Sequence, residues 1–175
     1  MKEIRVASES KDNPSSGNCR TTTERKSDYE LVVTRKFRAP ASRIFEAWTK
    51  PELLMRWWAP KSFGIVFVSC DTDAQAGGSY RFVFSHPAAE QPMAFFGKYI
   101  EVTPNSLLVW TNEEAGGNGA VTTVTFTEQS GETLVVLCDR YPTKEALDAA
   151  IASGSACGFE ETFEQLDELL AVSTR

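Results

Sequence analysis

The feature that most constrains the fold of this chain is a run of six strand-like segments with only short turns between them. Each segment is rich in β-branched and aromatic residues, and Gly, Pro, Asn and Ser separate the segments. Connections this short favour hairpins, because a parallel pair needs a crossover of a dozen or more residues. The pattern therefore predicts an antiparallel meander. Its strands are residues 65–70, 79–84, 94–102, 107–111, 121–127 and 134–140.

One strand and two short helices precede this meander, and a long helix follows it. Residues 29–37 have the composition of a strand, and residues 41–48 and 51–57 place apolar side chains at helical spacing. The last helix begins after Thr143, a good capping residue, and its apolar positions recur every three or four residues with acidic residues between them. We therefore predict one α+β domain over residues 29–172, with a seven-stranded antiparallel sheet packed on the C-terminal helix.

Residues 1–28 differ from the rest of the chain. They are dense in Ser, Thr, Asn and charged residues, with almost no large apolar side chain after Val6. Such a segment has too little apolar surface to fold by burial. We expect a flexible polar tail, and an arm that becomes ordered on a partner is the alternative.

Charge and hydropathy exclude several classes of function. The formal net charge is -6, and residues 144–170 alone carry seven acidic residues against one lysine. The rest of the chain has equal numbers of acidic and basic residues, so we expect no basic face for nucleic acid. No apolar run is long enough for a membrane span or a secretory signal, which predicts a soluble, cytoplasmic protein with no membrane partner.

No metal, cofactor or catalytic motif stands out. The four cysteines lie far apart, with no C-x-x-C pair and no nearby histidine, so we expect buried thiols and no zinc site. The only histidine, His86, precedes a proline and has no identified acid–base partner. Asp71 and Asp73 fit a turn, and the glycine-rich residues 116–119 lack the Gly-Lys-Ser/Thr of a phosphate loop. We expect no metal ion, no cofactor and no catalytic residue.

Several short motifs occur in order along residues 29–171. They are Phe37-x-Ala39-Pro40, Phe45-x-Ala47-Trp48, Trp57-Trp58-x-Pro60, Gly77-Gly78-x-Tyr80-x-Phe82, Gly97-x-Tyr99-x-Glu101 and Tyr141-Pro142-x-Lys144. Together they resemble the START-like (SRPBCC, helix-grip) superfamily, and within it the activator of heat-shock-protein-90 ATPase homologue-like and polyketide-cyclase-like branch. This resemblance implies a curved sheet around the C-terminal helix, with a cavity between them that the superfamily uses for apolar ligands.

Aromatic residues at alternating strand positions indicate which side chains line such a cavity. Tyr80, Phe82 and Phe84 share one strand face, which we assign to the concave side. Gly154 and Gly158 lie four apart in the last helix and leave space beside it; a kink or a close helix–sheet approach is the alternative. The predicted ligand-binding residues are Trp57, Phe67, Tyr80, Phe82, Phe84, Tyr99, Trp110, Gly154, Gly158, Phe159 and Phe163.

Three hypotheses for the function follow. The first is a binding or sequestration module for an apolar, aromatic or lipidic small molecule, since a cavity without catalytic groups holds a molecule rather than transforming it. The second is a polyketide cyclase- or aromatase-like enzyme, which requires polar side chains that converge inside the cavity. The third is a cochaperone-like or homodimeric interaction module that uses an exposed Trp57–Trp58 surface.

Overall fold

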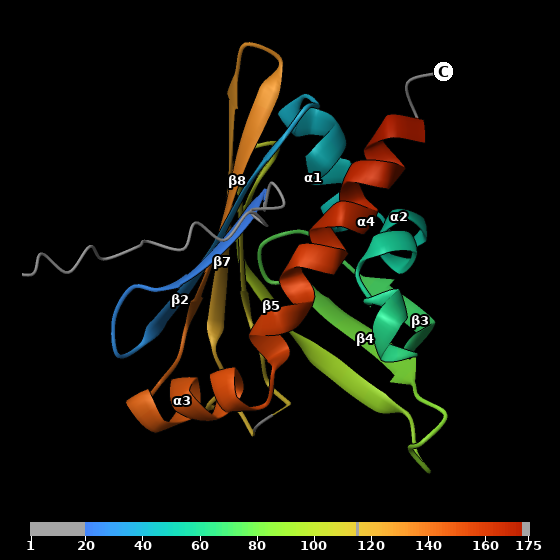
Figure 1. Cartoon of the computed structure of the whole chain (residues 1–175), viewed down its shortest axis with the longest axis vertical. Helices are drawn as coiled ribbons and strands as arrows, with labels where there is room; N and C mark the ends of the chain where they lie inside the picture. Colours follow the sequence, from blue (N-terminus) through green and yellow to red (C-terminus); the bar gives the residue numbers. More distant parts are fainter. Residues whose placement is uncertain (1–19, 115, 173–175) are drawn as a thin grey trace, which may run out of the picture.

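The computed structural model describes residues 20–114 and 116–172, and within these ranges the elements follow the predicted order (Figure 1). The strands are β1 (Thr21–Arg25), β2 (Glu30–Phe37), β3 (Val66–Thr72), β4 (Ser79–Ser85), β5 (Met93–Thr103), β6 (Leu107–Thr111), β7 (Val121–Gln129) and β8 (Glu132–Arg140). The helices are α1 (Ala41–Thr49), α2 (Pro51–Trp57), α3 (Lys144–Ala152) and α4 (Phe159–Val172), with short 3-10 helices η1 (Lys61–Phe63) and η2 (Ser155–Gly158).

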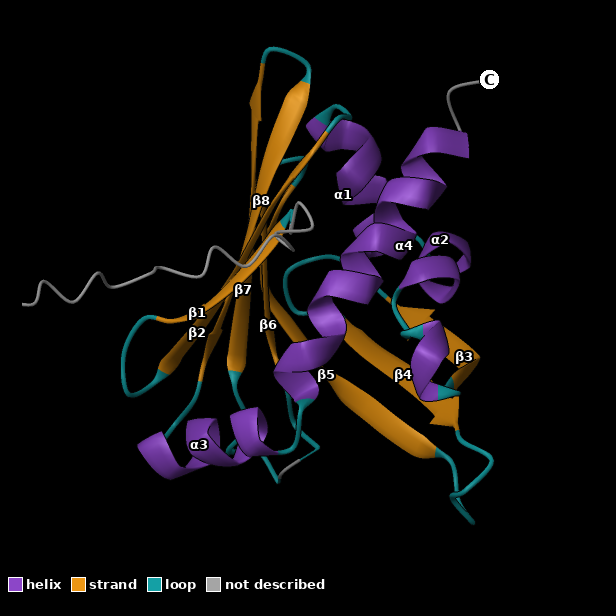
Figure 2. Cartoon of the chain, in the orientation of Figure 1, coloured by secondary structure: helices purple, strands orange, loops and turns teal. Residues whose placement is uncertain are grey.

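The described strands form one antiparallel sheet in the order β1-β2-β8-β7-β6-β5-β4-β3. Each strand from β3 to β7 pairs with the next one in the chain, which confirms the predicted meander. β2 joins this meander by pairing with β8, the last strand. Helices α1, α2 and α4 lie together on one side of the curved sheet (Figure 2). The predicted α+β helix-grip architecture is therefore confirmed.

The predicted tail over residues 1–28 is wrong in its second part. Residues 1–19 lie outside the described residues, but Thr21–Arg25 form strand β1, which pairs antiparallel with β2 and makes an eighth strand. The strand is too polar to be predicted from composition, because only Thr21 is buried. Its hydroxyl accepts a 2.9 Å hydrogen bond from Arg35, whose guanidinium also pairs with Asp167 of α4. β1 therefore covers a charged contact between the sheet and the last helix.

The core lies between the concave face of the sheet and the helices. Trp48, Trp57 and Phe163 are fully or almost fully buried and pack against one another with ring centroids 4.9 to 6.4 Å apart. The predicted exposed Trp57–Trp58 surface is wrong, because Trp57 is completely buried and Trp58 is half-buried against Trp48. The large apolar rings of these tryptophans are stabilised by burial in the core, so they do not form an exposed surface.

The predicted continuous C-terminal helix is interrupted between α3 and α4. Gly154 has a left-handed backbone with φ of +78°, which ends α3, and η2 then turns the chain into α4. Gly158 serves a different purpose, because a Cβ there would lie 3.2 Å from the ring of Pro60. Gly154 therefore marks a turn, and Gly158 marks a close approach to the segment after α2 rather than to the sheet. Gly158 also borders open space beside α4, as predicted, whereas Gly154 does not.

Candidate functional site

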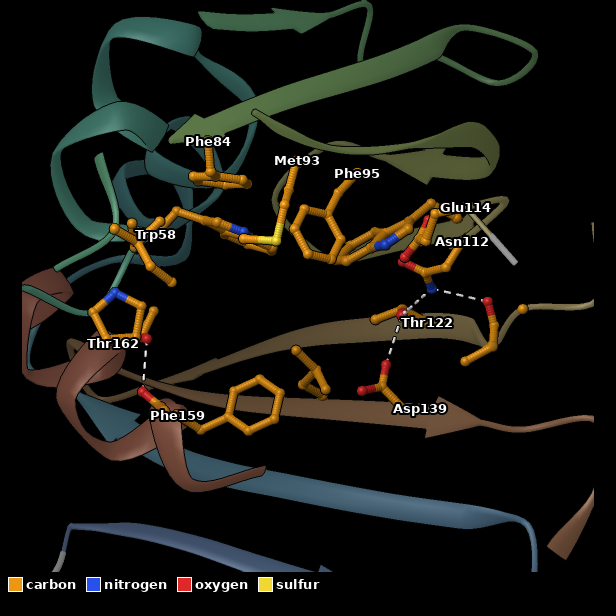
Figure 3. Close-up of a pocket in the computed structure, with 18 of the residues that line it drawn as sticks. Trp58, Phe84, Met93, Phe95, Asn112, Glu114, Thr122, Asp139, Phe159 and Thr162 are labelled. Atoms are coloured by element: carbon orange, nitrogen blue, oxygen red, sulfur yellow. Dashed lines mark hydrogen bonds between the residues drawn. The ribbon is translucent and has the colours of Figure 1, made fainter. Parts of the chain in front are cut away.

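A cavity of about 530 Å³ lies between the concave sheet face and the helices (Figure 3). Its walls are mostly apolar and aromatic. Phe63, Met93 and Phe95 line it while remaining exposed, so they lie where the cavity opens to solvent. The other aromatic side chains of the lining are Trp48, Trp57, Trp58, Phe84, Trp110, Tyr141, Phe159 and Phe163.

Strand alternation explains how these aromatics reach the interior. On β4, Tyr80, Phe82 and Phe84 are each 4 to 5% exposed, while Arg81 between them is exposed to solvent. The assignment of this face to the concave side is therefore confirmed. On β6, Leu108 and Trp110 point inward in the same way.

The predicted ligand-binding residues divide into three groups. Six of them line the main cavity: Trp57, Phe84, Trp110, Gly158, Phe159 and Phe163. Tyr80, Phe82 and Tyr99 instead line, with Trp110, an adjacent pocket of about 70 Å³. Phe67 and Gly154 line neither space.

The two residues outside both spaces have clear structural roles. Phe67 packs its ring on Phe84 with centroids 4.3 Å apart, so it supports the wall from the edge strand β3. Gly154 forms the turn after α3. Contact of the lining residues with a ligand stays a prediction.

A chain of hydrogen bonds crosses one end of the cavity. The hydroxyl of Tyr80 donates to the carbonyl of Thr111 over 2.8 Å and also lies 3.1 Å from Oδ1 of Asn112. Nδ2 of Asn112 donates to the hydroxyl of Thr122 over 3.0 Å. That hydroxyl donates to Oδ1 of Asp139 over 2.6 Å. Figure 3 shows Asn112, Thr122 and Asp139 together at the end of the cavity where Glu114 also lies. These polar lining residues were not among the predicted ones.

The register of the sheet brings these hydrogen-bonded residues together. Trp110 pairs with Thr122, and Thr122 pairs with Asp139, so neighbouring strands present these positions side by side. On β8, Asp139 follows the buried Val135 and Leu137 at intervals of two and therefore shares their inward face. The sequence signal was an acidic residue at an inward position of an otherwise apolar strand face.

The environment of Asp139 disfavours its charged form. Burial raises the pKa of this carboxyl from 3.8 to about 6, and the hydrogen bond from Thr122 only partly opposes that effect. Burial also raises the pKa of Tyr141, at the same end of the cavity, to about 12, with a further contribution from the charge of Asp139. The cavity lining in the described chain contains Glu114 and Asp139 but no Lys, Arg or His. No cation therefore balances the carboxylate.

The polar residues weighed from the sequence lie elsewhere. Asp71 and Asp73 are exposed. His86 is half-buried, and its Nδ1 accepts a 3.0 Å hydrogen bond from the backbone of Ala88. Within residues 20–114 and 116–172, no three acidic, Cys or His side chains form a group that could hold a metal ion.

The cysteines differ from the expected buried thiols. Cys70 and Cys138 are half-buried, Cys157 is exposed, and Cys19 lies outside the described residues. Burial raises the pKa of Cys70 to about 12, so this thiol stays protonated at neutral pH. Among the helices that the structure describes, none has the length and apolar character needed to cross a membrane.

A curved antiparallel sheet that grips a C-terminal helix, with an aromatic cavity between them, defines a START-like helix-grip protein. The family model described as Activator of Hsp90 ATPase homolog 1-like protein matches residues 38–171. The chain therefore belongs to this family. No curated protein matches it.

Solved structures share the same architecture over almost their whole length. A protein from Rhodobacter sphaeroides is 26% identical with a TM-score of 0.79, over 87% of this chain and 98% of the other. A protein from Mycobacterium smegmatis is 25% identical with a TM-score of 0.75, over 87% and 99%. An AHSA1-like protein from Aeromonas hydrophila, at 19% identity and a TM-score of 0.58 over 76% and 92%, is similar in fold alone.

Proposed function

We propose that this protein binds an apolar small molecule in the cavity between the sheet and α4. The observation that carries the proposal is a cavity of about 530 Å³ whose walls are mostly apolar and rich in aromatic rings, with Asn112, Thr122 and Asp139 together at one end. Pockets for small molecules commonly have volumes of roughly 300 to 1,000 Å³ and combine apolar walls with a few placed polar groups. The cavity has this composition.

Burial of ligand surface supplies the driving force. A ligand that hides about 200 Å² of apolar surface gains roughly 5 kcal/mol at 25 cal/mol per Å². The loss of translational and rotational freedom opposes this gain. The walls are already packed, with Trp58 held between Trp48, Phe82 and Trp110 at centroid distances of 5.4 to 6.4 Å. A preformed wall avoids an ordering cost on binding.

The test uses native mass spectrometry of the gently purified protein, followed by a thermal-shift screen of apolar compounds. A matched pair of variants on α3 controls for nonspecific effects: Ala146 lines the cavity, whereas Ala149 is exposed. We expect Ala146→Phe to reduce ligand-induced stabilisation and Ala149→Phe to leave it unchanged. If no compound co-purifies or stabilises the protein, and the two variants behave alike, the proposal is wrong.

A second candidate is an enzyme that moves protons within the cavity, as in polyketide cyclases. One observation favours it: Asp139 is a carboxyl in an apolar cavity with a pKa raised to about 6, which suits a general acid or base near neutral pH. The test is single-turnover cyclisation of a poly-β-keto thioester analogue. Asp139→Asn should abolish turnover, and turnover that persists in this variant would contradict the candidate.

Two further expectations concern the protein in the cell and in solution. A homodimer and a cytoplasmic location stay predictions. Multi-angle light scattering measures the first, with a monomer at all concentrations as the contradicting result. Cell fractionation measures the second.

A further inference from the structure

We propose that the ligand of this cavity is a lipophilic amine, bound as its ammonium ion with the charge against Asp139. This inference rests on the proposed binding function and specifies the class of ligand. Three independent features of the described residues support it: the charge of the lining, the direction of the hydrogen bonds at Asp139, and the aromatic walls.

The charge of the lining residues favours a ligand of positive charge. Two carboxylates, Asp139 and Glu114, line the cavity, and no lysine, arginine or histidine does. Figure 3 shows both carboxylates at the same end. A carboxylate or phosphate ligand placed there meets like charge at Asp139, whose carboxyl is desolvated by burial, which is unfavourable. A cation meets opposite charge and balances one of the two carboxylates.

The hydrogen bonds leave an acceptor that faces the cavity. Because the amide of Asn112 donates to Thr122, the hydroxyl proton of Thr122 is committed to Oδ1 of Asp139. The second amide N–H of Asn112 donates to the carbonyl of Ala120, and the hydroxyl of Tyr80 is shared between the carbonyl of Thr111 and Oδ1 of Asn112. These donors are therefore already used. Oδ2 of Asp139 has no hydrogen-bond partner among the described residues, and Figure 3 shows it turned away from Thr122. An ammonium group can donate a charge-assisted hydrogen bond to this oxygen.

The walls provide a second kind of contact for a cation. The rings of Trp110 and Phe159 line the same cavity, and Trp110 pairs with Thr122, which is hydrogen-bonded to Asp139. Aromatic rings attract ammonium groups through their quadrupole, and most strongly when water is excluded. The apolar part of the amine is buried against the remaining aromatic wall. A neutral apolar molecule uses the wall alone and leaves Asp139 with a single hydrogen bond.

The test compares three ligands that share one skeleton: 4-phenylbutylamine, 4-phenylbutanol and 4-phenylbutyrate. Isothermal titration calorimetry at pH 7.5 should rank the amine about tenfold or more above the alcohol, because a charge-assisted hydrogen bond replaces a neutral one. The carboxylate should bind most weakly. Asp139→Asn should reduce amine affinity to that of the alcohol. The control Asp71→Asn makes the same chemical change on the exposed side of β3 and should alter nothing.

A pH series on the unaltered protein provides a measurement that does not depend on a variant. The titratable groups that interact with Asp139 are Tyr80, Cys138 and Tyr141, and Glu114 lines the same cavity. Amine affinity should fall about tenfold between pH 7.5 and pH 5 as Asp139 becomes protonated, while alcohol affinity stays constant. The variant Glu114→Gln should retain this pH dependence and thereby assign it to Asp139.

The outcomes separate this inference from the proposed function. Equal affinity for amine and alcohol, or an amine preference that survives Asp139→Asn, overturns the inference and leaves apolar binding standing. Tighter binding of the carboxylate overturns it as well. Failure of all three compounds to bind counts against the cavity function itself.

Discussion

Asp139→Asn should make the folded protein more stable at neutral pH, although the substitution removes a residue of the candidate site. The pKa of Asp139 is raised from 3.8 to about 6 in the folded state, so folding favours its protonated form. Below the unfolded-state pKa the residue therefore costs nothing, and stability is lost as the pH rises through the folded-state pKa. A shift of about two units at 1.36 kcal/mol each amounts to roughly 3 kcal/mol at pH 7.5.

The assay is urea denaturation of the wild type and of Asp139→Asn at several values between pH 4 and pH 7.5. An asparagine oxygen still accepts the hydrogen bond that Thr122 donates, so the variant keeps the neutral form of the network. The stability difference should be close to zero at pH 4 and reach about 1 to 3 kcal/mol in favour of the variant at pH 7.5.

The matched control is Asp148→Asn. Asp148 pairs with Lys144 and Arg25, and its pKa is lowered by these hydrogen bonds. The sign is therefore opposite: this exposed carboxylate contributes stability above the unfolded-state pKa, and its loss should destabilise the protein at pH 7.5. A variant Asp139→Asn that is less stable than the wild type at pH 7.5, or a difference that does not change with pH, would refute the reasoning.

Three further predictions concern side chains that hold the cavity in place. Gln165→Leu should lower the free energy of unfolding by about 2 to 4 kcal/mol in urea denaturation, because Gln165 donates to two backbone carbonyls and accepts from the Lys61 N–H. Glu164→Gln is the exposed control, and equal stability of the two variants would contradict this prediction. Thr122→Val should raise the pKa of Asp139 above about 6 by removing its hydrogen-bond donor, measured by carboxyl NMR titration, and an unchanged pKa contradicts this. Gly154→Ala should lower the free energy of unfolding by about 1 kcal/mol, because φ is +78° and an alanine there strains the backbone although its Cβ meets no neighbouring atom. Gly154→Asn should recover part of the loss, and two variants as stable as the wild type would contradict the prediction.

The sheet and its concave face were predictable because local sequence patterns indicate them. Strand β4 alternates aromatic and polar residues, and the structure buries Tyr80, Phe82 and Phe84 as this alternation requires. The turns between strands contain the residues that turns need. Each of these features is determined by residues that are close together in the sequence, so it can be predicted without knowing the tertiary contacts.

The errors arose where long-range contacts decide. Strand β1 is polar and is held by pairing with β2 and by Arg35, which no local pattern reveals. The helix break at Gly154 requires a left-handed residue that helical periodicity does not report. The polar end of the cavity brings together residues from β4, β7, β8 and the segment after β6, and only the sheet register places them side by side. Asp139 was still detectable as an acid in an inward register.

Two charged side chains point from adjacent strands toward the same face, and their contrast indicates where function constrains this fold. Arg35 on β2 is 3% exposed and pairs with Asp167, so the structure compensates its charge. Asp139 on β8 lies at the cavity, has one hydrogen bond from Thr122 and has no cation among the lining residues. An uncompensated carboxylate lowers stability, and an asparagine would fit the same hydrogen bond without that cost. A residue that weakens the fold and faces an open cavity is best explained by what enters the cavity.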